Sequence, residues 1–214
     1  MFDLALSARP MIEALAPSYN VAPSQAIPII RSSQDNQQRT ISLLHWGLIP
    51  SWAKDAKIGN HTINARAETI ADKPSFKEAY KKRRCLVIAN GFYEWRAQQP
   101  GEPSKQPFHI HPKREQPLAF AGLWEHWKNP TNGKEVDSCC IITTVANQMM
   151  ADIHHRMPVI LEHENFHRWL DPTVSEAGDL LHPCSDNLLQ ADAVSTFVNN
   201  PKNNDARCLE PRKI

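Results

Sequence analysis

The sequence lacks a long apolar run, a strong net charge and any cysteine pair of the C-x-x-C type. Without an apolar run of bilayer length it holds no candidate membrane span, and its first residues lack the pattern of a signal peptide. A formal net charge of +1 excludes a global attraction to nucleic acid or membranes, so any polyanion site must be local. The odd total of 5 cysteines favours reduced thiols over a disulfide framework. We therefore expect a cytoplasmic protein.

Glycine is also scarce, with 7 residues against 17 prolines, which is typical of many short strands joined by loops. The length of 214 residues favours one domain spanning 1–214. Apolar and β-branched runs predict strands over residues 26–30, 39–45, 85–88, 108–111, 118–127, 136–145, 159–161 and 193–198. Short helices are expected over residues 68–79, 147–153, 162–170 and 175–181, with a weaker helical pattern ending near residue 15. The sequence predicts a strand-dominated α+β domain.

One carboxylate stands out at the end of the apolar run 85–88. An Asn90-Gly91 pair breaks that run, and Glu94 follows among the aromatic residues Phe92, Tyr93 and Trp95. A carboxylate that is partly desolvated by such neighbours binds its proton more tightly, which suits a group that both gives and takes protons. The alternative is a strand whose Glu94 simply points to water.

Two further stretches place polar groups beside apolar segments. Residues 63–68 contain Asn64 and Arg66, and residues 152–158 contain His154 and Arg156. Together with Glu94 they offer an acid/base group, an imidazole, an amide and two guanidiniums. The alternative is a buried ion-pair network in which Arg66, His154 and Arg156 pair with Glu68, Asp152 or Glu94, and the residues alone do not decide between the two.

Two tryptophans flank a Gly-to-Pro loop at residues 46–52. We expect Trp46 to lie in the core and Trp52 to be exposed, where it can stack on a nucleic-acid base.

A zinc-peptidase motif is also present, because His163-Glu164-Asn165-Phe166-His167 matches H-E-x-x-H on a predicted helix. The two imidazoles could face one metal while Glu164 activates its water. The polar flanks and the lack of a third ligand at the usual spacing argue against this site, and we expect no metal.

Other histidines and the cysteines offer no clear chemistry. His109 and His111 share one face of a strand that neighbouring prolines mark as an edge strand, so we expect surface histidines. Cys85, Cys139 and Cys140 lie in apolar strands and are expected to be small core residues.

The ordered set of motifs resembles the SOS-response-associated peptidase (SRAP) family over almost the whole chain. The motifs are Tyr19-Asn20-Val21-Ala22-Pro23, Trp46-Gly47-Leu48-Ile49-Pro50, Ile63-Asn64-Ala65-Arg66-Ala67-Glu68-Thr69, Asn90-Gly91-Phe92-Tyr93-Glu94-Trp95, Asp152-Ile153-His154-His155-Arg156-Met157-Pro158 and Val198-Asn199-Asn200. The resemblance implies a single mixed domain around a curved, barrel-like sheet with short helices. It also implies binding of abasic sites in single-stranded DNA, and a covalent thiazolidine made by the amine and thiol of an N-terminal cysteine that is exposed when the initiator Met is removed.

The resemblance further implies roles for individual residues. Glu94 would move protons, His154 would protonate the sugar-ring oxygen or assist reversal, and Asn64 would hold the sugar or the N-terminal residue. Arg66 and Arg156 would clamp phosphates, Trp52 would stack where the strand kinks, and Trp95 and Asn20 would also contact DNA. It implies no cofactor, and we expect a monomer.

The sequence departs from the family pattern at its start. The family begins Met-Cys-Gly-Arg followed by an aromatic residue, whereas this chain begins Met1-Phe2-Asp3, so that Phe2 matches the aromatic position. The other family motifs are intact, which favours a shortened form of an ancestor that could form the crosslink. The alternative is a non-covalent single-strand binding module. We expect the chain as printed to bind abasic DNA without forming a stable crosslink.

Overall fold

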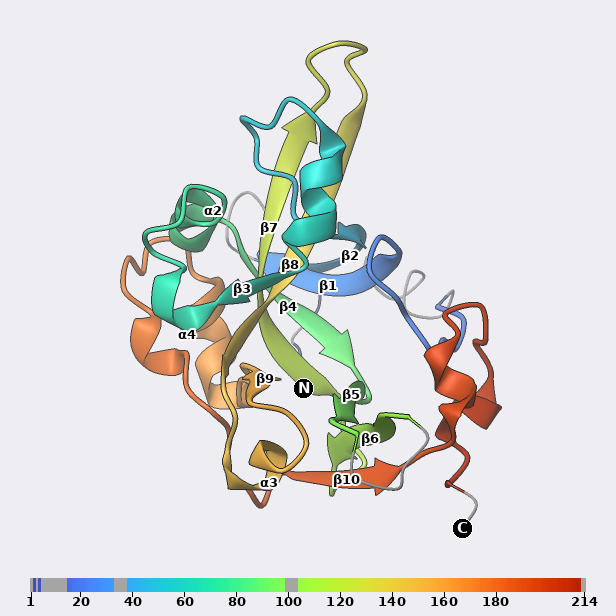
Figure 1. Ribbon diagram of the computed structural model, residues 1–214. Helices are drawn as coiled ribbons and strands as arrows, with labels where there is room; N and C mark the ends of the chain where they lie inside the picture. The colour runs from blue at the N-terminus through green and yellow to red at the C-terminus, as the bar shows by residue number, and fades with distance from the viewer. Residues whose placement is uncertain (1, 3, 5–14, 33–37, 99–103, 213–214) are drawn as a thin grey trace.

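Five strands close into a barrel at the centre of the molecule (Figure 1). The computed structural model describes residues 2, 4, 15–32, 38–98 and 104–212. The barrel strands are β1 (Ala26–Ser32), β2 (Arg39–Trp46), β4 (Arg84–Ala89), β7 (Leu118–Lys128) and β8 (Glu135–Val145). The barrel closes because β2 pairs with β1 on one edge and, in parallel, with β8 on the other. The predicted mixed domain around a barrel-like sheet is confirmed.

The barrel interior is filled by alternate residues of the strands. All five strands contribute to one buried cluster, which includes Ile29, Leu44, Val87, Phe120 and Ile141. This follows from the two-residue repeat of a strand, which sends every second side chain to the same face.

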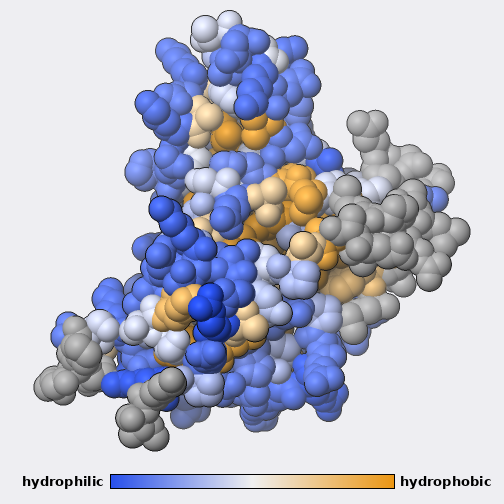
Figure 2. Space-filling view, turned by 90° about the vertical axis from the view of Figure 1, so that its right-hand side faces the viewer, coloured by the Kyte–Doolittle hydropathy of each residue, from blue (hydrophilic) through white to orange (hydrophobic). Residues whose placement is uncertain are grey.

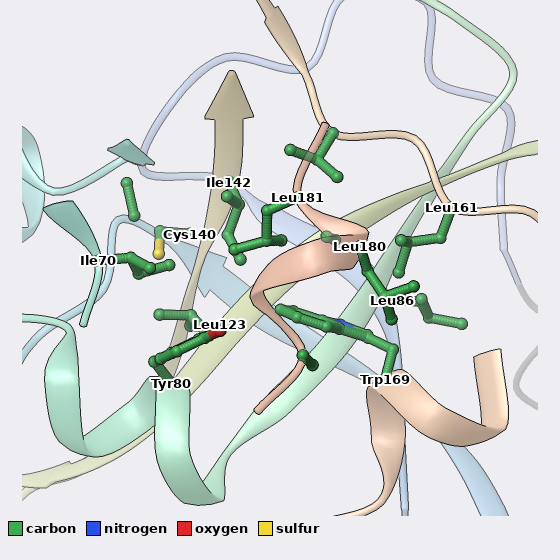
Figure 3. Packing of buried hydrophobic residues seen from close by; sticks show 14 of the residues in the cluster. Ile70, Tyr80, Leu86, Leu123, Cys140, Ile142, Leu161, Trp169, Leu180 and Leu181 are labelled. Atoms are coloured by element: carbon green, nitrogen blue, oxygen red, sulfur yellow. The ribbon is translucent and has the colours of Figure 1, made fainter. Parts of the chain in front are cut away.

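The other face of β4 is covered by two short helices, α2 (Lys77–Lys82) and α4 (Phe166–Leu170). The side chains of Trp169, Tyr80 and Leu86 meet there in a second buried cluster (Figure 3). The Trp169 indole Nε1 donates to the Cys85 carbonyl at 2.9 Å, so this large side chain is buried with its polar atom satisfied. The helices therefore close the outside of the barrel on this side.

A smaller antiparallel sheet lies beside the lower end of the barrel (Figure 1). It consists of β5 (Phe92–Arg96), β6 (Gln106–Pro112) and β10 (Leu189–Ala193), with β6 in the middle. The prediction of an edge strand at His109 and His111 is wrong, because β6 pairs on both sides and both imidazoles are half-buried. Its prolines stand near the two ends of β6, where a missing N–H disturbs the ladder least.

Two three-residue strands extend the end of β8. β3 (Asn64–Arg66) runs parallel to β8 with Arg66 opposite Thr143, and β9 (Arg156–Pro158) runs antiparallel to it with Pro158 also opposite Thr143. The two sequence stretches rich in polar residues thus meet on either side of one strand.

A narrow arm rises from the barrel at the top of Figure 1. The β7–β8 hairpin packs there against the segment containing the 3₁₀ helix Ala56–His61, around Ile49, Ala53 and Trp127. Gly47 and Gly59 pack back to back at its base: a Cβ on Gly47 would lie 2.6 Å from the Gly59 carbonyl oxygen. This close approach brings the Gly-to-Pro loop against the segment that leads into β3. The face of the molecule in Figure 2 is mainly hydrophilic, with apolar side chains gathered across its middle.

The first six predicted strands along the chain are confirmed, and the errors concern the last two. The strand predicted over 159–161 is assigned as β9 three residues earlier, although Ile160 still forms a bridge with Phe120. The strand predicted over 193–198 is wrong: β10 ends at Ala193, and Ser195 caps a 3₁₀ helix, Thr196–Asn199, by accepting from the Phe197 N–H.

The predicted helices are real but shorter. The region 68–79 holds the 3₁₀ helix Ala67–Thr69 and the start of α2, and 147–153 holds α3 (Gln148–Ala151). The region 162–170 divides into the 3₁₀ helix His163–Asn165 and α4, and 175–181 keeps only the 3₁₀ helix Gly178–Leu180. A further 3₁₀ helix, Ala206–Leu209, follows near the C-terminus. The helical pattern before residue 15 falls outside the described residues. Within the described part of the chain, no helix has the length and apolarity needed to cross a membrane.

Candidate active site

Glu94 and His154 come together although they lie on different elements. Glu94 is in the middle of β5, and His154 lies in the short connection between α3 and β9. The Glu94 Oε1 and the His154 Nδ1 are 3.7 Å apart, and the two side chains are 26% and 34% exposed. Glu94 therefore does not simply point to water, and the pair can exchange protons with a bound molecule.

The proton affinity of Glu94 is altered in the expected direction. Burial raises the pKa of Glu94 above its ordinary value, and this effect outweighs the opposite effects of the nearby His154 and of the Trp95 N–H. A raised pKa brings the carboxyl group closer to the range in which it is useful as both acid and base at neutral pH.

The orientation of Glu94 follows from the local sequence of β5. Tyr93 and Trp95, on the opposite face of the strand, pack against a small buried cluster that contains Val198. The Tyr93 hydroxyl donates to the Tyr19 carbonyl at 2.7 Å, which fixes that face. Because side chains alternate along a strand, Glu94 is left on the side of His154.

The imidazole of His154 is held by the main chain of Arg156. The His154 Nδ1 lies 3.0 Å from the Arg156 carbonyl oxygen and 3.2 Å from the Arg156 N–H nitrogen. These contacts direct Nδ1 into the protein and leave Nε2 as the ring nitrogen for a ligand.

The side chain of Arg156 is occupied by the protein itself. Its guanidinium binds both carboxylate oxygens of Glu68, at 2.7 and 3.0 Å, and donates to the Thr143 carbonyl at 2.6 Å and hydroxyl at 3.3 Å. The Arg156 guanidinium lowers the pKa of Glu68. The ion-pair alternative thus describes Arg156 and Glu68 correctly, and direct phosphate binding by Arg156 would require it to exchange partners.

Arg66 and Asn64 remain open to a ligand. Both are exposed on the same face of β3, while Ala65 between them is buried. Among the described residues, the guanidinium of Arg66 has no carboxylate within ion-pair distance, in contrast to Arg156. Arg66 is therefore the better placed of the two arginines to bind a phosphate.

The three tryptophans differ in exposure. Trp52 is 58% exposed, as predicted, with its Nε1 3.4 Å from the Pro74 carbonyl. Trp46 is partly buried and packs against the barrel interior, and its Nε1 donates to the Ile63 carbonyl at 3.0 Å. Trp95 is half-buried, with its Nε1 bonded to Asn199. Of the three, Trp52 presents the largest free aromatic surface.

Asn20 has a structural position, and its expected contact with DNA stays a prediction. Its side chain is only 7% exposed. Its amide nitrogen lies 3.0 to 3.2 Å from the carbonyl oxygens of Val198, Asn200 and Asn203. The side chain thus ties residues 18–20 to the C-terminal segment, and its donors are not available to a ligand.

Sequence reasoning missed Thr143 because it is one of several polar residues of β8 and nothing local distinguishes it. Its position at the end of β8, opposite both Arg66 and Pro158, depends on tertiary pairing. Alternation along β8 was the available signal, since Thr143 shares a strand face with Asp137.

The H-E-x-x-H residues do not form a site. His163 belongs to a 3₁₀ helix and His167 to α4, and both are exposed while Phe166 and Trp169 take the buried positions. Within the described ranges, no group of three His, Cys, Asp or Glu side chains is arranged to hold a metal. Cys85, Cys139 and Cys140 are buried core residues, as predicted, and burial raises their pKa values.

A cavity of about 710 Å³ lies elsewhere, beside Arg31, Trp124 and Asp137 at the other end of the barrel. Asp137 and Thr143 are six residues apart on β8, which corresponds to roughly 20 Å along the strand. The candidate site is therefore separate from this cavity.

Comparison with known proteins connects this site to a family. The family model for the SOS response associated peptidase (SRAP) matches residues 3–201. The chain is 46% identical over 197 residues to the abasic site processing protein YoqW of Bacillus subtilis, which covers 91% of this chain and 86% of that protein. It is 36% identical over 233 residues to the abasic site processing protein HMCES of Pongo abelii, covering 91% of this chain and 65% of that protein.

Solved structures agree with the sequence comparison. The crystal structure of a protein from Bacteroides thetaiotaomicron matches with a TM-score of 0.86 at 31% identity, over 99% of this chain and 93% of that chain. One from Bordetella bronchiseptica matches with a TM-score of 0.71 at 26% identity, over 91% and 98%. With a family match over nearly all of its length, the chain belongs to the SOS response associated peptidase family.

Proposed function

We propose that this protein binds abasic sites in single-stranded DNA and shields them through a covalent thiazolidine link. Relatives at 46% and 36% identity are abasic site processing proteins. The observation that carries the proposal is the approach of Glu94 to His154, together with the exposed Asn64 and Arg66 on β3, which pairs with the same end of β8 as β9 does. This arrangement combines an acid/base pair with a cation for phosphate.

The chemistry joins an amine and a thiol to the ring-opened sugar aldehyde. The amine nitrogen attacks the carbonyl carbon, one water leaves the carbinolamine, and the thiolate sulfur adds to the imine carbon to close a five-membered ring. An α-amine titrates near about pH 8 and a thiol near about 8.5, so both are partly deprotonated at neutral pH. Each step moves a proton, and Glu94, with its raised pKa, serves as the shuttle.

The neighbouring residues have distinct tasks in this proposal. His154, whose Nε2 has no hydrogen-bond partner among the described residues, protonates the sugar-ring oxygen during opening or assists reversal. Asn64 holds the sugar or the N-terminal residue by hydrogen bonds. Arg66 contacts a flanking phosphate, and Trp52 stacks on a base where the strand bends. Trp95 lies on the face of β5 opposite Glu94, where a DNA contact would be separate from the acid/base pair, and Arg156 acts mainly within the protein.

The amine and thiol come, in this proposal, from a cysteine three residues ahead of Phe2, in the order Cys-Gly-Arg-Phe2. Phe2 is held in place, because its ring stacks on Phe166 at 5.5 Å and its carbonyl accepts from Arg39 at 3.2 Å. Three residues span at most about 10 Å, which limits how far the cysteine lies from Phe2. Removal of the initiator Met by the protein itself exposes the amine, with Glu94 as the base.

The test compares two polypeptides on abasic single-stranded DNA. The chain that starts at Met1 carries no thiol beside its amine, so it should bind the DNA and give only a reversible imine. The chain that starts Cys-Gly-Arg-Phe2 should give an adduct that survives heating on a denaturing gel. A heat-stable adduct of equal yield from both chains, or from neither, would refute the proposal.

A purely non-covalent single-strand binding module is the second candidate, supported by the exposed Trp52 and Arg66. It predicts salt-sensitive binding by both polypeptides and no heat-stable adduct from either.

A further inference from the structure

Glu68 is connected to His154 through a single residue, Arg156. The Glu68 carboxylate binds the Arg156 guanidinium through two hydrogen bonds, and the Arg156 main chain contacts the His154 Nδ1 through both its N–H and its carbonyl. Side chain and main chain of one residue therefore link a carboxylate on the β3 side of the site to the imidazole on the β9 side.

The Arg156 side chain is nearly enclosed. It is 15% exposed, and its Nε is buried without a hydrogen-bond partner. Its other contacts in the network are to Thr143 at the end of β8. Glu68 is the carboxylate that neutralises this guanidinium, so removing it leaves a largely buried charge to move toward water or another partner.

The contacts at Nδ1 suit a ring that must change its protonation. When Nδ1 carries a proton it can donate to the Arg156 carbonyl, and when it carries a lone pair it can accept from the Arg156 N–H. The imidazole can therefore present Nε2 as a base or as an acid without turning. This requires the Arg156 peptide to stay within hydrogen-bond distance of the ring.

Several charged or titratable groups surround His154. Glu94 approaches from β5, Arg156 from β9 and the His155 ring, at 4.4 Å between centroids, from the next residue. Glu68 stands behind Arg156 and also feels the charge of Arg66. Asp152, at the end of α3, is exposed.

We propose that Glu68 is a positioning residue for His154, because its carboxylate fixes Arg156 and the Arg156 main chain then fixes the imidazole. This inference rests on the proposed function, in which His154 acts on the bound sugar. It assigns Arg156 to the support of the acid/base pair and leaves Arg66 as the contact for phosphate.

The test is the substitution E68Q in the Cys-Gly-Arg-Phe2 polypeptide. Gln keeps the size of the side chain but removes the charge that neutralises Arg156. The matched control is D179N, because Asp179 also binds an arginine through both oxygens, at 2.5 and 2.6 Å from Arg168, but on an exposed surface. We expect E68Q to slow adduct formation by about 10-fold or more, since small misplacements of reacting groups are costly. D179N should react at the parent rate.

Two measurements separate positioning from a general loss of structure. The affinity of E68Q for abasic DNA, measured by fluorescence anisotropy, should stay within about two-fold of the parent if Arg66 supplies the phosphate contact. The imidazole ¹⁵N signals of His154 in the unliganded protein should change in E68Q and not in D179N. A parent reaction rate in E68Q together with unchanged His154 signals would overturn the inference.

The NMR result also separates this inference from the proposed function. If the parent polypeptide forms no adduct, the proposed function fails, and the His154 signals alone then decide whether Glu68 positions the ring. If E68Q does not fold, E68D replaces it under the same criteria, because Asp keeps the charge but withdraws the carboxylate by one methylene group.

Discussion

Replacing Gly91 by Ala should displace the strand that carries Glu94. A Cβ at this position would lie 2.4 Å from the His109 Nε2 and 2.7 Å from the Ile110 carbonyl oxygen. The His109 ring is confined between Tyr93, at 5.4 Å, and His111, at 4.8 Å, and the carbonyl belongs to the main chain. Neither atom can give way easily, so β5 must move relative to β6.

The loss of stability in Gly91→Ala can be bounded from the usual cost of overpacking. Extra atoms in a well-packed site cost about 1–3 kcal/mol, which in a protein of this size lowers the Tm by roughly 2–12 °C. Glu94 lies three residues beyond Gly91 on the displaced strand. A shift of about 1 Å at a reacting group can cost about 10²-fold in rate, so adduct formation by the Cys-Gly-Arg-Phe2 polypeptide should fall by about that factor.

The assay measures thermal unfolding and the rate of heat-stable adduct formation on gels. The control is Gly178→Ala, where a Cβ meets only the Tyr80 hydroxyl, at an ordinary 3.4 Å. This control should leave the reaction rate unchanged. A G91A protein with the parent stability and rate would show that the Asn-Gly break does not set the position of Glu94.

Four further substitutions test individual contacts. Asn20→Ala removes an amide whose nitrogen contacts three main-chain carbonyl oxygens. It should therefore lower the free energy of unfolding, measured by denaturant titration, by about 2–4 kcal/mol. Unchanged stability with weakened DNA binding would instead support a contact between Asn20 and DNA. Burial raises the Glu94 pKa above 4.5, so this group favours the folded state at low pH and that contribution is lost as pH rises through the raised pKa. Glu94→Gln should therefore have a higher Tm than the parent at pH 7 and an equal one at pH 4, and a lower Tm at pH 7 would contradict the sign. Arg66→Ala removes one phosphate contact, so the slope of log K against log salt concentration for single-stranded DNA binding should become less negative by about 0.7. Trp52→Ala should weaken binding by roughly 1–3 kcal/mol at an unchanged salt slope. A changed salt slope in Trp52→Ala and an unchanged one in Arg66→Ala would contradict both assignments.

The strands of the barrel could be predicted from residue patterns because they are long and agree with local preference, whereas the barrel-like closure was implied only by the family resemblance. The run 118–127 is rich in apolar and aromatic residues and the run 136–145 in β-branched ones, which is enough to outweigh other conformations. The strand prediction for 193–198 is wrong because the capping of a 3₁₀ helix by Ser195 competes with the strand propensity of this segment. The edge-strand prediction for His109 and His111 is wrong because their strand pairs with β10, about 80 residues later in the chain, and this pairing leaves no local signal.

The central residues of the site could be predicted from the sequence, but the hydrogen bonds that link them to distant parts of the chain could not. Glu94 stood out because a carboxylate among aromatic residues is unusual in any strand. The sequence does not identify the carboxylate partner of Arg156, because Glu68 is 88 residues away and only the pairing of β3 and β9 with β8 brings the two together. The structural contacts of Asn20 could not be predicted because its acceptors lie 178 to 183 residues later, on a segment whose packing the sequence does not reveal.

The most direct measurement is the rate of heat-stable adduct formation on abasic single-stranded DNA by the Cys-Gly-Arg-Phe2 polypeptide, compared with its Glu94→Gln variant at equal DNA occupancy. If Glu94 moves the protons of this reaction, the variant should react about 10²-fold or more slowly while its affinity for the DNA is unchanged. Equal rates in the two proteins would contradict the assignment of Glu94 as the acid/base group of the site.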